Sequence, residues 1–116
     1  MAKALGIGGV FFRARNVEEL SAWYQTHLGV TGFWNQEPGA TVFAPFRSDT
    51  DYFPADRQWM LNFRVDDLHA LIEQLLAAGI AVETRPGEWD TPETGQFARI
   101  ADPEGNQIEL WQPPSR

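Results

Sequence analysis

The stretch Phe12-Arg13-Ala14-Arg15-Asn16-Val17 recurs further along the chain as Phe63-Arg64-Val65-Asp66-Asp67-Leu68. A helical pattern follows each copy and stops at a glycine, first in His27-Leu28-Gly29-Val30 and then in Ala77-Ala78-Gly79-Ile80. Self-similarity at a fixed spacing indicates a structural unit that occurs twice. We therefore predict a duplicated strand–helix–strand–strand unit.

The length of the chain limits it to one domain. Its 116 residues and 13.1 kDa give room for a single core. We place the whole of 1–116 in one domain, with modules of approximately 1–57 and 58–116. A module of this size is near the lower limit for folding alone, which favours joining two of them.

Both predicted helices carry clear signals. Asn16 is placed to cap the first, with Glu19 three residues on, and Asp66 and Asp67 cap the second. One apolar stripe consists of Val17, Leu20, Tyr24 and Leu28, and the other of Leu68, Leu71, Ile72, Leu75 and Leu76. Because a helix this short is not stable alone, each stripe must pack on a sheet.

Strands are predicted from runs of apolar residues between turn signals. The turns are Pro38-Gly39 and Asp102-Pro103-Glu104-Gly105-Asn106, and residues 85–95 form a long loop. The predicted strands cover about 6–14, 31–36, 40–46, 59–65, 80–85, 96–101 and 106–112, with a short one near 50–53.

Composition excludes several classes of partner. The chain has 16 Asp and Glu against 9 Lys and Arg, a formal charge of -7, which disfavours nucleic acid and anionic membrane surfaces. No apolar run approaches the ~18 residues of a membrane helix. There is no cysteine for a disulfide or a thiolate site. We expect a soluble, cytoplasmic protein with no nucleic-acid or membrane partner.

Five stretches of the sequence carry a family resemblance: Val10–Asn16, Ala22–Tyr24, His27–Val30, Asn62–Leu68 and Asp102–Trp111. Together they resemble the vicinal oxygen chelate superfamily, which includes glyoxalase I, bleomycin-resistance proteins and extradiol dioxygenases. The resemblance covers nearly the whole chain. It implies an α+β fold of two βαβββ modules that form a curved, incomplete barrel around a cavity, with helices outside. Members are commonly homodimers, so a homodimer is expected.

The resemblance also implies where a metal would lie. Metal-using members place a His in the first strand of each module and a Glu in the last strand, often with a fourth ligand. Gly9 and Met60 stand at the two His positions, Glu109 at the Glu position, and Asp51 near the fourth. Gly9 and Met60 offer nothing to a hard divalent ion. We expect no metal and no other cofactor, unless unusual ligands recruit a divalent ion. The two histidines, His27 and His69, belong to the predicted helices.

Strand alternation separates the two faces of the predicted sheet. If Gly9, Met60 and Glu109 face the cavity, so do their period-two neighbours, and Val10, Phe12, Leu61, Phe63, Val65, Ile108 and Leu110 face the helices. Two interpretations stay open: a ligand cavity, or a filled barrel in which Arg13 or Arg64 pairs with Glu109. The candidate ligand-binding residues are Phe11, Arg13, Met60, Asn62, Arg64, Phe97, Arg99, Gln107 and Trp111, and the candidate catalytic residue is Glu109.

Three functions compete. The first is a metal-independent small-molecule-binding protein of the glyoxalase/bleomycin-resistance type, because its cavity is aromatic and both His positions are lost. The second is a lyase, isomerase or dioxygenase that uses Glu109 as a general base or metal ligand. The third is an interaction protein with a vestigial pocket.

Overall fold

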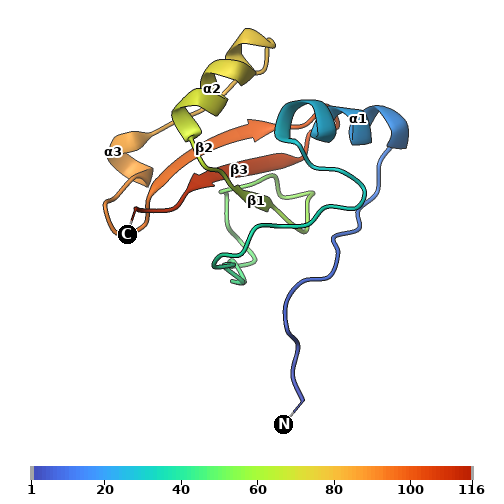
Figure 1. Ribbon diagram of the computed structural model, residues 1–116, viewed down its shortest axis with the longest axis horizontal. Coiled ribbons are helices and arrows are strands. Elements are labelled where there is room, and N and C mark those ends of the chain that lie inside the picture. The colour runs from blue at the N-terminus through green and yellow to red at the C-terminus, as the bar shows by residue number, and fades with distance from the viewer. Residues whose placement is uncertain (1, 116) are drawn as a thin grey trace.

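The computed structural model describes residues 2–115 and has an α+β fold (Figure 1). Three strands form one mixed sheet in the order β1-β3-β2, in which β1 is parallel and β2 antiparallel to β3. None of the helices within 2–115 has the length and hydropathy of a membrane-spanning segment. In chain order the elements are α1 (Val17–Leu28), β1 (Leu61–Arg64), α2 (Leu68–Ala77), α3 (Pro86–Trp89), β2 (Gln96–Ala101) and β3 (Gln107–Gln112).

One face of the sheet carries the core. Figure 1 shows α1 and α2 on the same side of the sheet, with the stretch that joins α1 to β1 passing the other side. The predicted apolar stripes supply the helical part of the core, and alternate residues of β2 and β3 supply the rest. The buried apolar residues are Leu20, Tyr24, Leu68, Leu75, Ala98, Ile100, Ile108 and Leu110.

Both helices begin where their caps predict. Asn16 Oδ1 accepts a hydrogen bond from the Glu19 amide at 3.0 Å, and Asp67 Oδ1 accepts one from the Ala70 amide at the same distance. Helix α1 ends at Gly29, whose φ of 71° lies in the left-handed region that favours glycine. These two caps are confirmed.

The first half of the chain differs from its prediction. Within residues 2–115, no strand forms over 6–14, 31–36, 40–46 or 50–53, and the predicted strand over 80–85 is a single bridge from Glu83 to Arg99. A strand is stable only when its backbone groups pair with a neighbour. The N-terminal segment extends away from the body (Figure 1), and no residue among 2–115 pairs with it as a strand neighbour. The fold found is therefore a three-stranded mixed sheet in place of two complete βαβββ modules.

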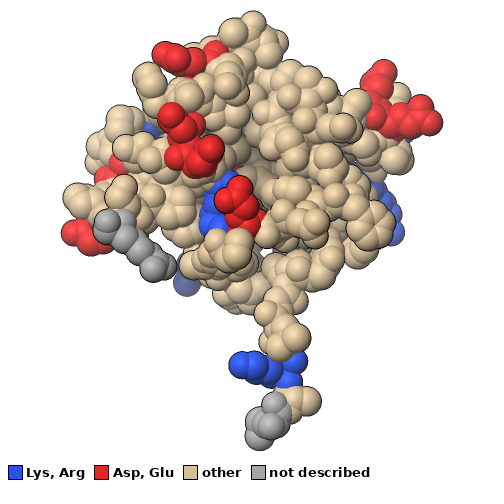
Figure 2. Space-filling model, viewed as in Figure 1, with Lys and Arg blue, Asp and Glu red and all other residues tan. Residues whose placement is uncertain are grey.

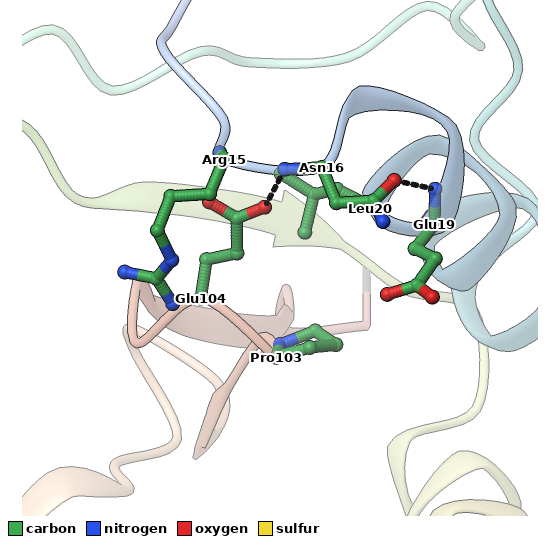
Figure 3. A pocket seen from close by; sticks show the side chains of 6 residues that line it. All are labelled: Arg15, Asn16, Glu19, Leu20, Pro103 and Glu104. Carbon is green, nitrogen blue, oxygen red and sulfur yellow. Dashed lines mark hydrogen bonds between the residues drawn. The ribbon is translucent and has the colours of Figure 1, made fainter.

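Side-chain contacts fasten α1 to the turn between β2 and β3. Tyr24 Oη donates to Asp102 Oδ2 at 2.7 Å in a buried hydrogen bond. The Glu104 carboxylate accepts from the amides of Arg15 at 2.6 Å and Asn16 at 2.9 Å (Figure 3). The contacts of Glu104 border a small cavity of about 150 Å³, lined also by Glu19, Leu20 and Pro103. They hold the two halves of the chain together.

Candidate functional site

The face of the sheet opposite the helices carries polar and aromatic side chains in cross-strand rows. The central row is Asn62, Glu109 and Arg99, and the next row is Arg64, Trp111 and Phe97. Met60 and Gln107 lie at the near end of the same face, where Gln107 Nε2 is 3.2 Å from Met60 Sδ. The strands thus bring eight of the ten candidate residues onto one face.

Glu109 lies at the centre of this face, and both of its carboxylate oxygens accept hydrogen bonds. Tyr52 Oη donates a hydrogen bond to Oε2, and Asn62 Nδ2 donates to Oε1 at 2.8 Å. Burial and the nearby Glu109 carboxylate raise the pKa of Tyr52 well above its usual value. Tyr52 is therefore a neutral phenol at physiological pH and donates its proton to the hydrogen bond with Glu109.

The backbone around Tyr52 is also held by the sheet. Its carbonyl oxygen accepts from Gln107 Nε2 at 2.7 Å and from Arg99 Nη1 at 3.1 Å. The residues on either side have no strand partner, so these side-chain contacts fix the position of the segment. Residues 50–55 consequently cross the polar face of the sheet.

Arg99 connects the centre of the site to α3. Its guanidinium lies over the rings of Tyr52 and Trp89, at 5.3 and 5.0 Å from their centroids. Its Nε donates to Glu83 Oε1 at 3.0 Å. Hydrogen bonds from Arg99 and Arg85 lower the pKa of Glu83, which stays ionised and balances the charge of Arg99.

A hollow of about 420 Å³ opens beside this segment, lined by residues 50–55 with Arg99 and Gln107. Aromatic rings surround Tyr52: Phe46 lies at 6.0 Å and Trp89 at 6.1 Å between ring centroids. Apolar walls with a few converging polar groups are typical of small-molecule sites. On the face drawn in Figure 2, Lys and Arg side chains lie in small, separate groups.

Three candidate residues lie away from the hollow or make other contacts. Phe11 is 95% exposed, and Arg13 is exposed beside it in the N-terminal segment. Arg64 donates to the carbonyl of Glu37 at 2.8 Å, so the interpretation in which Arg13 or Arg64 pairs with Glu109 is wrong. Glu109 is instead satisfied by a phenol and an amide.

Phe97 and Trp111 form an aromatic pair at the end of the same face. Their rings are stacked, with centroids 6.2 Å apart and planes 7° from parallel. Trp111 Nε1 donates to the Thr94 carbonyl at 2.7 Å, which fixes the indole. The pair forms a rigid flat wall beside the central row.

Tyr52 is the site residue that the sequence did not single out. The stretch Asp49–Pro54 indicated either a pocket rim or an ordinary connection. No periodic pattern links it to the sheet, because its position depends on Arg99 and Gln107, far along the chain. A polar-aromatic stretch just before the second module was its only signal.

The residues at the implied metal position do not fit a divalent ion. Gly9 has no side chain and lies in the N-terminal segment, while the Met60 thioether contacts the Gln107 amide. Asp51 is exposed and lines the hollow. Among residues 2–115, no three His, Asp or Glu side chains gather in a group that could hold a metal.

Comparison with known proteins gives two kinds of match. The family model described as a glyoxalase-like domain matches residues 9–111. The structure of TnmS3, an antibiotic-binding protein from Streptomyces sp. CB03234, is 27% identical over 95% of this chain and 99% of that one, with a TM-score of 0.55. A glyoxalase/bleomycin resistance protein from Streptomyces sp. CB03234 is 28% identical over 84% of this chain and 91% of that one, with a TM-score of 0.49. No curated protein sequence gives a significant match.

Proposed function

The chain belongs to the glyoxalase-like domain family, and from that premise we propose that it is a small-molecule-binding protein of the glyoxalase/bleomycin-resistance type. The ligand binds on the exposed face of the sheet, in the hollow beside residues 50–55. The observation that carries this proposal is a hollow of about 420 Å³ in which Arg99 and Gln107 meet the rings of Tyr52 and Phe53, with Glu109 behind the Tyr52 hydroxyl. TnmS3 is an antibiotic-binding protein that is similar to this chain along nearly its whole length, and this similarity supports the proposal.

Binding in this proposal is independent of a metal. The support is the donor set: a glycine, a thioether engaged by an amide, and one carboxylate whose two oxygens already accept hydrogen bonds. A hard divalent ion prefers several oxygen ligands that converge. Recognition then rests on hydrogen bonds and ring contacts.

The enzymatic alternative has weaker support from the geometry. A general base needs a lone pair that can reach the substrate proton. Here both oxygens of Glu109 accept hydrogen bonds from neutral donors, the Tyr52 hydroxyl and the Asn62 amide, an arrangement that suits recognition of a donor more than removal of a proton. We therefore assign Glu109 to ligand recognition.

The proposed function is tested by titrating the chain with bleomycin and with a library of neutral aromatic fragments. Binding is monitored through the amide chemical shifts of the protein. We expect saturable shifts at Arg99, Gln107 and Glu109. Gln107→Ala should weaken any such binding at least tenfold, because Gln107 lines the hollow and holds residue 52. Arg47→Ala is the control, because the Arg47 side chain is exposed and forms its hydrogen bond and ion pair with Asp49, outside the lining of the hollow. Shifts confined to α1 and α2, or no binding at all, would contradict the proposal.

We also propose that the chain functions as a homodimer. Its accessible surface is 9245 Å², whereas a compact monomer of 13.1 kDa exposes about 6,400 Å². Its radius of gyration is 14.9 Å against about 13 Å for this length. The excess of about 2,800 Å² per chain is at the upper end of what each chain of an obligate dimer buries. The first half of the chain also exposes large apolar side chains: Leu5, Ile7, Val10, Phe11, Phe12, Phe33, Trp34, Val42, Phe43 and Phe46.

A second copy would give these segments the partner that they lack within the chain. The strands predicted over 6–14, 31–36 and 40–46, and with them the two-module barrel, would then form on association. Light scattering during gel filtration tests this: we expect twice the chain mass. Phe11→Glu should shift the mass to that of one chain, while Leu76→Glu, on the exposed side of α2, should leave it unchanged. A wild-type chain that stays monomeric at every concentration would refute the dimer. The predicted cytoplasmic location stays a prediction.

A further inference from the structure

Tyr52 makes hydrogen bonds to the polar groups at the centre of the site through both its side-chain hydroxyl and its backbone carbonyl. Its phenol hydroxyl donates to Glu109, and its carbonyl oxygen accepts from Arg99 and Gln107. All three partners project from β2 and β3, whereas residue 52 lies in a stretch without strand or helix. The sheet therefore recognises a hydroxyl on an aromatic ring together with a carbonyl at the distance that separates them in a tyrosyl residue.

We propose that the ligand of this site is a neutral hydroxyaryl compound that carries a carbonyl group, and that it replaces Tyr52 on Glu109, Arg99 and Gln107. The proposal rests on the small-molecule-binding function proposed above and names its ligand class. Residues 50–55 act in the free protein as an internal occupant of the same contacts.

The hydroxyl requirement follows from Glu109. When Tyr52 is displaced, Oε2 of Glu109 loses its hydrogen-bond donor. Leaving a partly buried carboxylate without that donor costs free energy. A ligand with a hydroxyl restores the bond, whereas the same ring without a hydroxyl does not. Sites built around such a bond reject the analogue that lacks it.

The charge requirement follows from the carboxylates. Glu109 lies at the centre of the sheet face, and Asp51 lines the hollow. The guanidinium of Arg99 already donates to Glu83 and to the Tyr52 carbonyl. The chain as a whole carries -7. An anionic ligand would be repelled, so a phenolic amide or ketone is favoured over a phenolic acid.

The aromatic requirement follows from the rings around the phenol. Trp89 meets the Tyr52 ring edge-on at 6.1 Å, and the Arg99 guanidinium lies 5.3 Å from its centroid. An aromatic ring in the same place keeps both contacts. The hollow along residues 50–55 leaves room for a ligand larger than one phenol.

Three small compounds test the proposal against the purified chain. N-acetyl-L-tyrosinamide has the hydroxyl, ring and carbonyl; N-acetyl-L-phenylalaninamide lacks the hydroxyl; N-acetyl-L-tyrosine adds a negative charge. Their dissociation constants are measured by amide chemical shifts in the wild type and in Tyr52→Ala, which removes the internal phenol. We expect Tyr52→Ala to bind the tyrosinamide at least tenfold more tightly than the wild type does, and at least tenfold more tightly than it binds either other compound.

Two further variants secure the result. In the Tyr52→Ala background, Glu109→Gln should weaken tyrosinamide binding at least tenfold, while Glu73→Gln, at an exposed position of α2, should not change it. Should Tyr52→Ala fail to fold, Tyr52→Phe keeps the ring and removes only the hydroxyl, and it should still bind the tyrosinamide severalfold more tightly than the wild type.

The outcomes separate this proposal from the function on which it rests. Equal binding of the tyrosinamide and the phenylalaninamide would overturn the ligand class. So would binding of bleomycin or of fragments on this face without any binding of the tyrosinamide, and the proposed function would then stand. If no compound binds on this face, both proposals fail.

Discussion

The hydrogen bond between Tyr24 and Asp102 gives a sharp prediction for stability. Both residues are buried, at 6% and 4% exposure, and their oxygens are 2.7 Å apart. Burial and the neighbouring carboxylate raise the pKa of Tyr24, so the phenol stays protonated and donates. Tyr24→Phe removes this donor and leaves the ring in place.

The magnitude follows from what Asp102 keeps. A hydrogen bond to a charged group contributes about 1.5–3 kcal/mol. In the variant the Asp102 carboxylate still accepts from the amides of Glu104 and Asn106 and from Asn106 Nδ2, at 2.8 to 3.0 Å. The cost should therefore lie at the lower end, at about 1.5–2 kcal/mol. Asp102→Ala should cost about 3–4 kcal/mol, because it leaves the Tyr24 hydroxyl and two amides without their acceptor.

Urea unfolding at a fixed protomer concentration measures these values, since a dimer makes stability concentration-dependent. The double variant should destabilise by less than the sum of the single changes, because both remove the same bond. Tyr52→Phe is the matched control, because it removes the hydroxyl of the second of the two tyrosines in the chain. Its hydroxyl lies at the half-buried site, so its loss should change ligand binding more than stability. A cost below about 0.5 kcal/mol for Tyr24→Phe would refute the reasoning.

Two further predictions concern acid stability and one glycine. Hydrogen bonds from the amides of Arg15 and Asn16 lower the pKa of Glu104 below its ordinary 4.5. The stabilisation from the ionised carboxylate is complete above pH 4.5 and is lost as the pH falls through the lowered pKa. In Glu104→Gln the free energy of unfolding should therefore fall less steeply in acid. Identical pH profiles of the unfolding free energy for variant and wild type would refute this. Gly95 has a φ of 100°, and a Cβ there would collide with the Gln112 carbonyl oxygen. Gly95→Ala should cost about 2 kcal/mol or more by thermal unfolding, whereas Gly87→Ala, with open space around it, should be neutral or stabilising; equal melting temperatures would contradict this.

Local signals in the sequence predicted the second half of the chain well. The leucine stripe and the Asp67 cap placed α2, and the run over 96–101 matches β2 at both ends. Period-two alternation put Asn62, Arg99 and Glu109 on one face, because each lies in a strand whose other face is covered by helices. Such features depend on neighbours in the sequence.

Features that depend on distant contacts were not predicted. The run over 6–14 has the composition of a strand, but pairing needs a partner that the chain alone does not place beside it. Tyr52 reaches Glu109 only because Gln107 and Arg99 hold its carbonyl. No spacing rule connects residue 52 to the last strand.

The location of a bound ligand tests the central claim most directly. Isotope-filtered NOE spectra of the chain with N-acetyl-L-tyrosinamide, or with the tightest aromatic fragment found, report which side chains lie next to the compound. We predict contacts from the ligand ring to Phe53, which lines the hollow, and to Trp89, which packs against the Tyr52 ring in the free chain. Contacts confined to α1 and α2, on the other side of the sheet, would contradict the account.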